Sequence, residues 1–187
     1  MHDISGKKIL ILATHGFEQS ELELPRDRLK AAGATVEVVS PESGSIKGWK
    51  NKDWGPAVQV DRALGEARAD DYDAIILPGG QMNPDILRGN ADALALIRAF
   101  FDAGKVVAAV CHAPWLLIDT GIAKDRKVTS WPTVRRDLEN AGARWVDEEV
   151  VTDNGVITSR KPADLEAFSA KIAEELVEGR HQRRKAA

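Results

Sequence analysis

The single cysteine of the chain, Cys111, lies where a run of small and aliphatic residues gives way to an apolar run that begins with a proline. The stretch is VVAAVCHAPWLLI, residues 106–118, and His112 follows the cysteine directly. A thiolate is a strong nucleophile, and a nearby histidine can act as its base. The pattern indicates nucleophilic or redox chemistry at Cys111, although a lone cysteine after a buried strand is also a common unreactive core residue.

Small residues stand two positions before and after the cysteine, at Ala109 and Ala113. A sharp strand-to-helix turn needs small side chains there, because larger ones collide when the chain doubles back. Pro114 suits the first turn of a helix, where its missing N–H does no harm. We therefore predict that Cys111 lies on a tight turn before a helix N-terminus, exposed and with a lowered thiol pKa.

Backbone donors for a developing oxyanion are expected from a second turn, the glycine pair Gly79-Gly80 that ends another apolar run. The N–H of His112 is a further candidate donor. The pocket is expected to include His15, Trp115 and Trp131. Because tryptophan is also common in protein cores, core packing is the alternative interpretation for Trp115 and Trp131.

Apolar runs and helical spacing alternate along the chain, which predicts repeated strand-helix-strand units. The predicted strands are 9–13, 35–40, the run that ends at the glycine pair, and 105–110. The predicted helices are 17–33, 92–103, 113–122 and 163–177. Residues 43–63 are expected to form a loop or a short hairpin, and Asn154-Gly155 predicts a tight hairpin turn.

These elements predict a doubly wound α/β fold with a mainly parallel sheet, whose ligand site lies at the carboxyl ends of the strands. Residues 1–179 are expected to form a single domain. The basic segment 180–187 is expected to be a solvated end, with contact to an anionic surface as the alternative.

Composition narrows the function classes. With 187 residues, 43% of them hydrophobic, and a net charge of −3, the chain lacks the basic character of a nucleic-acid-binding protein. One cysteine allows no internal disulfide, and the N-terminal apolar run is too short for a signal peptide or a membrane span, so the cytoplasm is the expected location. No metal-ligand spacing is present, and neither a metal nor another cofactor is expected.

Several segments together resemble the PfpI family of the DJ-one/PfpI superfamily: ILPGG (76–80), VCHAPWLLI (110–118), ELELPRDRLKAAG (21–33) and the stretch 125–165. The resemblance runs from about Lys7 to about Leu176. It implies a three-layer, flavodoxin-like α/β fold of the glutamine-amidotransferase type, a homodimer or higher homo-oligomer, and a reactive cysteine. Members are described as cysteine peptidases, as deglycases or glyoxalases, and as oxidative-stress proteins.

The resemblance also implies roles for single residues. Cys111 matches the nucleophile, His112 the residue after it, and Glu21 the carboxylic acid that points at the thiol. A carboxyl group beside a thiolate should keep its proton and donate a hydrogen bond to sulfur. Asp85 stands where peptidase-like members carry a Glu that reaches the histidine from an adjoining subunit. The aspartate side chain is one methylene shorter than glutamate, and the loop before it has one extra residue. An ordinary acidic N-cap or first-turn residue is therefore an equally good interpretation of Asp85. Ala113 departs from the family's usual glycine.

The site residues and the family resemblance leave two hypotheses about the chemistry of Cys111. In the first, the Cys111 thiolate attacks small carbonyl or glycation-adduct substrates, with peptide hydrolysis as a more demanding variant. In the second, oxidation of Cys111 without turnover is the relevant event. A glutamine amidotransferase is excluded because no His followed by Glu occurs downstream of the cysteine, and a purely structural role is the remaining alternative.

Overall fold

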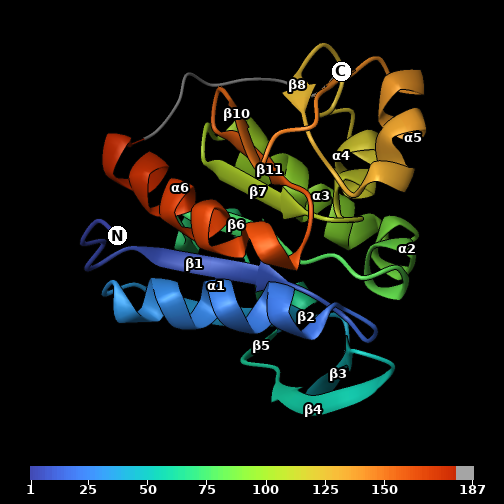
Figure 1. Cartoon of the computed structure of the whole chain (residues 1–187). Helices are drawn as coiled ribbons and strands as arrows, with labels where there is room; N and C mark the ends of the chain where they lie inside the picture. Colours follow the sequence, from blue (N-terminus) through green and yellow to red (C-terminus); the bar gives the residue numbers. More distant parts are fainter. Residues whose placement is uncertain (180–187) are drawn as a thin grey trace.

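A seven-stranded sheet forms the centre of the protein (Figure 1). The structure is a computed structural model, and it describes residues 1–179. The strands are β1 (Lys8–Leu12), β2 (Thr35–Ser40), β5 (Arg62–Ala63), β6 (Ala74–Leu77), β7 (Val106–Val110), β10 (Val150–Asp153) and β11 (Val156–Ser159). Their order is β10-β11-β7-β6-β1-β2-β5, and only the β10–β11 pair is antiparallel. The basic tail expected at 180–187 lies outside the described residues.

Helices cover both faces of the sheet, because the strands are apolar on both sides. In β1, Ile9 and Ile11 belong to one buried cluster and Leu10 and Leu12 to the other. The first cluster includes side chains of α1 (Gln19–Ala31) and α6 (Leu165–Glu178). The second includes side chains of α2 (Met82–Arg88), α3 (Ala91–Asp102), α4 (Pro114–Asp119) and α5 (Arg135–Asn140). The predicted doubly wound, three-layer α/β fold is confirmed.

Most predicted elements are present with shifted ends. Helix α4 ends at Asp119 rather than at 122. Asn154 and Gly155 both have positive φ, 47° and 75°, so the predicted hairpin turn between β10 and β11 is confirmed. Elements that the pattern did not predict are α2, α5, and the short pair β8 (Lys127–Val128) and β9 (Arg144–Trp145). Short 3₁₀ helices occupy Leu64–Glu66, Ala69–Asp71, Pro132–Val134 and Pro162–Asp164.

The excursion at 43–63 is a hairpin of β3 (Ser45–Lys50) and β4 (Asp53–Gln59), and it packs on the N-terminal end of α1. The buried Gln19 side chain donates to the Pro56 carbonyl at 3.3 Å. A Cβ at Gly48 would lie 2.5 Å from the Gln19 side-chain oxygen, so a glycine is needed for this close approach. The packing holds the hairpin at the carboxyl end of the sheet.

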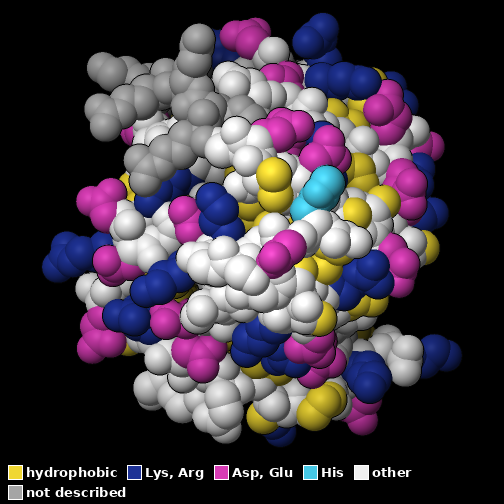
Figure 2. Space-filling view, turned by 90° about the vertical axis from the view of Figure 1, so that its left-hand side faces the viewer, with side chains coloured by type: hydrophobic (Ala, Val, Ile, Leu, Met, Phe, Trp, Pro, Cys, Tyr) yellow, Lys and Arg dark blue, Asp and Glu magenta, His cyan; other side chains and the backbone are white. Residues whose placement is uncertain are grey.

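The surface carries charges of both signs. On the face shown in Figure 2, Lys and Arg side chains are interspersed with Asp and Glu, and hydrophobic side chains form small scattered patches. Within residues 1–179, no helix combines the length and the apolar character that crossing a membrane requires.

Candidate active site

The tight turn expected at Cys111 is present between β7 and α4. Cys111 has φ of 63°, a left-handed conformation that non-glycine residues rarely adopt. Its N–H donates to the Ser159 carbonyl at 3.1 Å, and its carbonyl accepts from the Trp131 N–H at 2.9 Å. The strained residue is thus held from both sides, as is common where a fold positions a functional group.

A cavity of about 640 Å³ opens at the carboxyl ends of the parallel strands, next to this turn. Its size suits a small organic molecule, and its position is the one expected for a doubly wound sheet. The lining residues come from the loops after β1, β6, β7, β8 and β11, from the starts of α1 and α2 and from the β3–β4 hairpin. They are Gly16, Glu18, Glu21, Trp49, Asn51, Gly80, Gln81, Met82, Cys111, His112, Trp131 and Pro162.

Glu21 lies in the first turn of α1 and is completely buried. Its Oε2 accepts a hydrogen bond from the Gly79 N–H at 2.8 Å, and its carboxyl group also interacts with the Cys111 thiol. Burial raises the pKa of Glu21 to about 8, and the nearby Glu18 charge adds to this rise. Glu21 is therefore mainly protonated at neutral pH, in contrast to a solvated surface glutamate.

The Cys111 sulfur lines the cavity, yet the residue is only 6% exposed. Burial raises the pKa of the Cys111 thiol, and the Glu21 carboxylate raises it further, whereas hydrogen bonds from the N–H groups of Gly80 and His112 lower it. The expectation of an exposed thiol with a lowered pKa is therefore wrong. The removal of the thiol from water raises its pKa by more than the nearby N–H dipoles lower it. Helix α4, which follows the cysteine, is also short, with six residues.

His112 is buried beside the cysteine, with its Nδ1 at 3.2 Å from the Cys111 sulfur. Its ring lies edge-on to Trp115 at 5.2 Å and is stacked on Trp131 at 6.0 Å between centroids. Burial lowers the pKa of His112, so the ring is neutral at neutral pH. A neutral imidazole next to a thiol is able to accept its proton.

The two glycines after β6 differ in what their N–H groups do. Gly79 donates to Glu21, so its N–H is not available to a substrate oxyanion; for Gly79 that expected role needs correction. The N–H groups of Gly80 and His112 point toward the sulfur instead. A Cβ at Gly80 would lie 2.4 Å from the Gly16 carbonyl oxygen, and φ is 78°, so only glycine fits there.

Three expected site residues lie away from the cavity in this chain. Asp85 is an exposed residue in the first turn of α2. The Trp115 ring packs on His112 and donates to Asp137 at 2.8 Å, behind the lining. His15 accepts from the Lys47 N–H at 3.1 Å and supports the hairpin, while its neighbour Gly16 lines the cavity.

Several site residues were not found from the sequence. Trp49 and Glu18 line the cavity from the hairpin and the start of α1. Asn83 is fully buried: its side chain accepts from the Thr14 N–H at 2.8 Å and donates to the carbonyls of Pro78 and Gly79 at 2.8 and 3.3 Å. It ties the glycine turn to the loop after β1.

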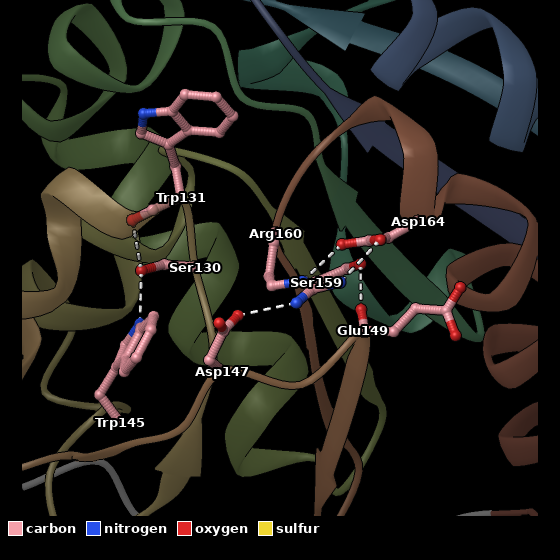
Figure 3. Close-up of polar contacts among 8 residues, drawn as sticks. All are labelled: Ser130, Trp131, Trp145, Asp147, Glu149, Ser159, Arg160 and Asp164. Atoms are coloured by element: carbon pink, nitrogen blue, oxygen red, sulfur yellow. Dashed lines mark hydrogen bonds and ion pairs between the residues drawn. The ribbon is translucent and has the colours of Figure 1, made fainter.

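Polar contacts hold in place the two loops that carry the lining residues Trp131 and Pro162 (Figure 3). Arg160 contacts both Asp147 (2.7 Å) and Asp164 (2.8 Å), which fixes the loop that carries Pro162. Ser130 donates to the Trp131 carbonyl at 2.9 Å and accepts from the Trp145 indole at 2.9 Å.

These contacts reduce the freedom of the backbone that carries Trp131.

Among residues 1–179 no cluster of three or more His, Cys, Asp or Glu side chains is placed to hold a metal ion.

Comparison with known proteins places this geometry in a family. Residues 7–175 match the DJ-1/PfpI family, and the chain belongs to it. A deglycase of Thermococcus kodakarensis is 45% identical over 161 residues, covering 86% of this chain and 94% of its own. YraA of Bacillus subtilis, whose name proposes a cysteine protease, is 39% identical, covering 88% and 95%. The crystal structure of DJ-1beta from Drosophila melanogaster superposes with a TM-score of 0.83 at 31% identity, covering 91% and 90%.

Proposed function

We propose that the protein is a cysteine-dependent hydrolase of the PfpI type that acts on small carbonyl compounds or on their glycation adducts; the relatives named deglycases support this proposal. The observation that carries the proposal is the Cys111 sulfur on the wall of a cavity of about 640 Å³, with the His112 Nδ1 at 3.2 Å and the Glu21 carboxyl beside it. The cavity is large enough for a small substrate, and we assign Cys111 as the nucleophile, His112 as the base and Glu21 as the acid.

At rest the pair of Glu21 and Cys111 is mainly neutral, because burial raises the pKa of both groups and both hold their protons near neutral pH. The nucleophilic thiolate is expected to form when the neutral His112 imidazole, with its Nδ1 at 3.2 Å from the sulfur, accepts the thiol proton. The N–H groups of Gly80 and His112 face the sulfur, and a protonated Glu21 can donate to it, so this geometry supports the thiolate once it has formed.

In the proposed reaction the Cys111 sulfur forms a bond to the carbonyl carbon and the carbonyl oxygen becomes an oxyanion. The N–H groups of Gly80 and His112 are then the nearest backbone donors for that oxygen. The neutral His112 imidazole accepts the proton of the Cys111 thiol as the carbon–sulfur bond forms and returns it to the oxyanion, which gives a neutral thiohemiacetal. Carbonyl addition needs only these parts, whereas peptide hydrolysis requires a carboxylate that orients His112, and within residues 1–179 no carboxylate hydrogen-bonds to it.

Activity measurements test this proposal directly. We expect wild type to consume methylglyoxal and Cys111→Ser to lose at least about 100-fold of that rate, because a hydroxyl lacks the acidity of a thiol. A peptide cleavage assay run on both proteins checks the peptidase alternative. Equal methylglyoxal consumption by wild type and Cys111→Ser would overturn the proposal.

Oxidation of Cys111 without turnover is a second candidate, favoured by the protonated Glu21 beside the sulfur and by the lack of any second cysteine that could form an internal disulfide. Mass spectrometry after mild peroxide treatment tests it. The candidate requires addition of one or two oxygen atoms at Cys111 in the folded protein; a thiol that reacts only after denaturation excludes it.

We also propose that the chain acts in the cytoplasm as a homodimer or higher homo-oligomer. Two exposed apolar side chains on α2, Met82 (40%) and Ile86 (49%), support an interface beside Asp85. Such an interface could bring Asp85 to a partner's histidine, the role that the family resemblance implies for this position. Light scattering on Ile86→Glu should then show a smaller particle than wild type, and an unchanged mass would refute this interface.

A further inference from the structure

Charge is unevenly distributed on the wall of the cavity. Two carboxyl groups line it, those of Glu18 and Glu21, and no Lys or Arg of residues 1–179 does. Three lysines are sequence neighbours of lining residues without lining the cavity themselves: Lys50, Lys52 and Lys161. Lys50 and Lys52 are exposed and Lys161 is half-buried, and Glu21 is mainly protonated at neutral pH, so Glu18 is the residue that gives the lining its negative charge.

Glu18 is the acid that is available to a ligand. It precedes α1, where its Oε1 accepts from the Ser20 hydroxyl at 3.1 Å, and no Lys or Arg of the described chain forms an ion pair with it. It is half-buried, and the hairpin residue Trp49 is bridged to it backbone to backbone. A carboxylate in such a place attracts a cation more strongly than one in open water.

Aromatic rings complete the surroundings of this acid. Trp49 and Trp131 both line the cavity. Trp49 is supported edge-on by Trp54 at 5.6 Å between centroids, and Trp131 is stacked on His112. Indole faces bind guanidinium and ammonium groups, and they give no compensating attraction to carboxylates.

We infer that the cavity selects by charge: it favours carbonyl compounds that bear a guanidinium or ammonium group, which Glu18 and Trp49 bind while the carbonyl carbon faces Cys111, and it disfavours those that bear a carboxylate. This selection rests on the proposed function for its biological use. As a property of the cavity it can be measured without turnover.

Thiol modification provides that measurement, because Cys111 is the only cysteine in 187 residues. Three methanethiosulfonates of different charge serve as probes: 2-(trimethylammonium)ethyl, methyl, and 2-sulfonatoethyl. Each transfers its thioalkyl group to the thiolate and releases methanesulfinate. The cation-to-anion ratio of rates cancels changes in the thiolate fraction, and the same ratio in urea-unfolded protein is the reference.

In the folded wild type we expect the cation-to-anion ratio to exceed the unfolded reference by about tenfold or more at low salt and to fall as salt is added. Glu18→Gln should lower the ratio about fivefold, since it removes the charge and keeps the shape. Glu66→Gln, which removes an exposed carboxylate that does not line the cavity, is the matched control and should leave the ratio unchanged.

Trp49→Leu tests the aromatic part and should slow the cationic probe about threefold relative to the methyl probe. Melting temperatures of all variants verify that they fold. A folded wild-type ratio equal to the unfolded one, or an equal ratio in wild type and Glu18→Gln, would overturn the inference. Loss of methylglyoxal turnover bears on the proposed function alone, because the modification ratio does not depend on catalysis.

Discussion

Replacing Gly79 by alanine is the sharpest test of how closely the site is packed. The added Cβ would lie 2.6 Å from Glu21 Oε2, 2.7 Å from the Cys111 Cβ and 2.7 Å from the Val110 carbonyl oxygen. All three distances are shorter than a carbon atom tolerates, and the atoms belong to buried groups or to backbone that cannot swing aside. Gly79 has no positive φ, so the effect is steric and does not include backbone strain.

The expected cost has two parts. Overpacking of a filled site costs about 1–3 kcal/mol. Displacement of Glu21 weakens the hydrogen bond from the Gly79 N–H, and an unpaired buried polar group costs about 1–3 kcal/mol. The two parts together cost about 2–6 kcal/mol in the free energy of unfolding, and a loss of about 3 kcal/mol already corresponds to a melting temperature lower by about 6–12 °C for a domain of this size.

Thermal unfolding followed by circular dichroism, together with the alkylation rate of Cys111, gives the assay for Gly79→Ala. Gly65→Ala is the matched control, because a Cβ at Gly65 meets no atom within 4 Å. We expect Gly65→Ala to keep the wild-type melting temperature. If Gly79→Ala melts within about 1 °C of wild type and keeps the alkylation rate of Cys111, the described packing is incorrect.

Three further predictions follow from the same contacts. Because the pKa of Glu21 is raised to about 8, the folded protein binds more protons than the unfolded chain between pH 5 and 8, so stability should fall as pH rises through this window; urea titrations should show Glu21→Gln without that slope. Asn83→Ala leaves the buried Thr14 N–H and the Pro78 carbonyl without their partner, while the Gly79 carbonyl keeps the Glu18 N–H at 3.4 Å; the change should lower the free energy of unfolding by about 2–4 kcal/mol in urea, and a loss below about 1 kcal/mol contradicts this bracing role. Arg160→Gln leaves the buried Asp164 carboxylate unpaired and should cost about 1–3 kcal/mol, while Lys127→Gln, at an exposed ion pair, should change stability by less than about 0.5 kcal/mol; equal effects of the two would refute the distinction.

The sequence predicts the centre of the sheet well because β1 after Lys8, β6 and β7 are short, unbroken apolar runs. It also predicts the turn at Cys111, since Ala109 and Ala113 are a local requirement of that turn. The turn is strained in the structure, with φ of 63° at the cysteine. Local patterns were sufficient for both features.

What the sequence does not predict depends on contacts between distant segments. Trp49 reaches the cavity because the hairpin packs on Gln19, 30 positions earlier in the chain. Asn83 follows the glycine pair closely, but its bonds to the loop after β1 have no local signal. The thiol pKa was expected to be lowered because the helix N-terminus is visible in the sequence, whereas the burial that raises it is a property of the whole fold.

The left-handed backbone at Cys111 places heat resistance and chemistry in opposition at one residue. A glycine would adopt φ of 63° without the steric cost of about 1–2 kcal/mol that a side chain incurs there. The same substitution would remove the nucleophile, so the backbone conformation that positions the sulfur is one that the cysteine side chain itself disfavours.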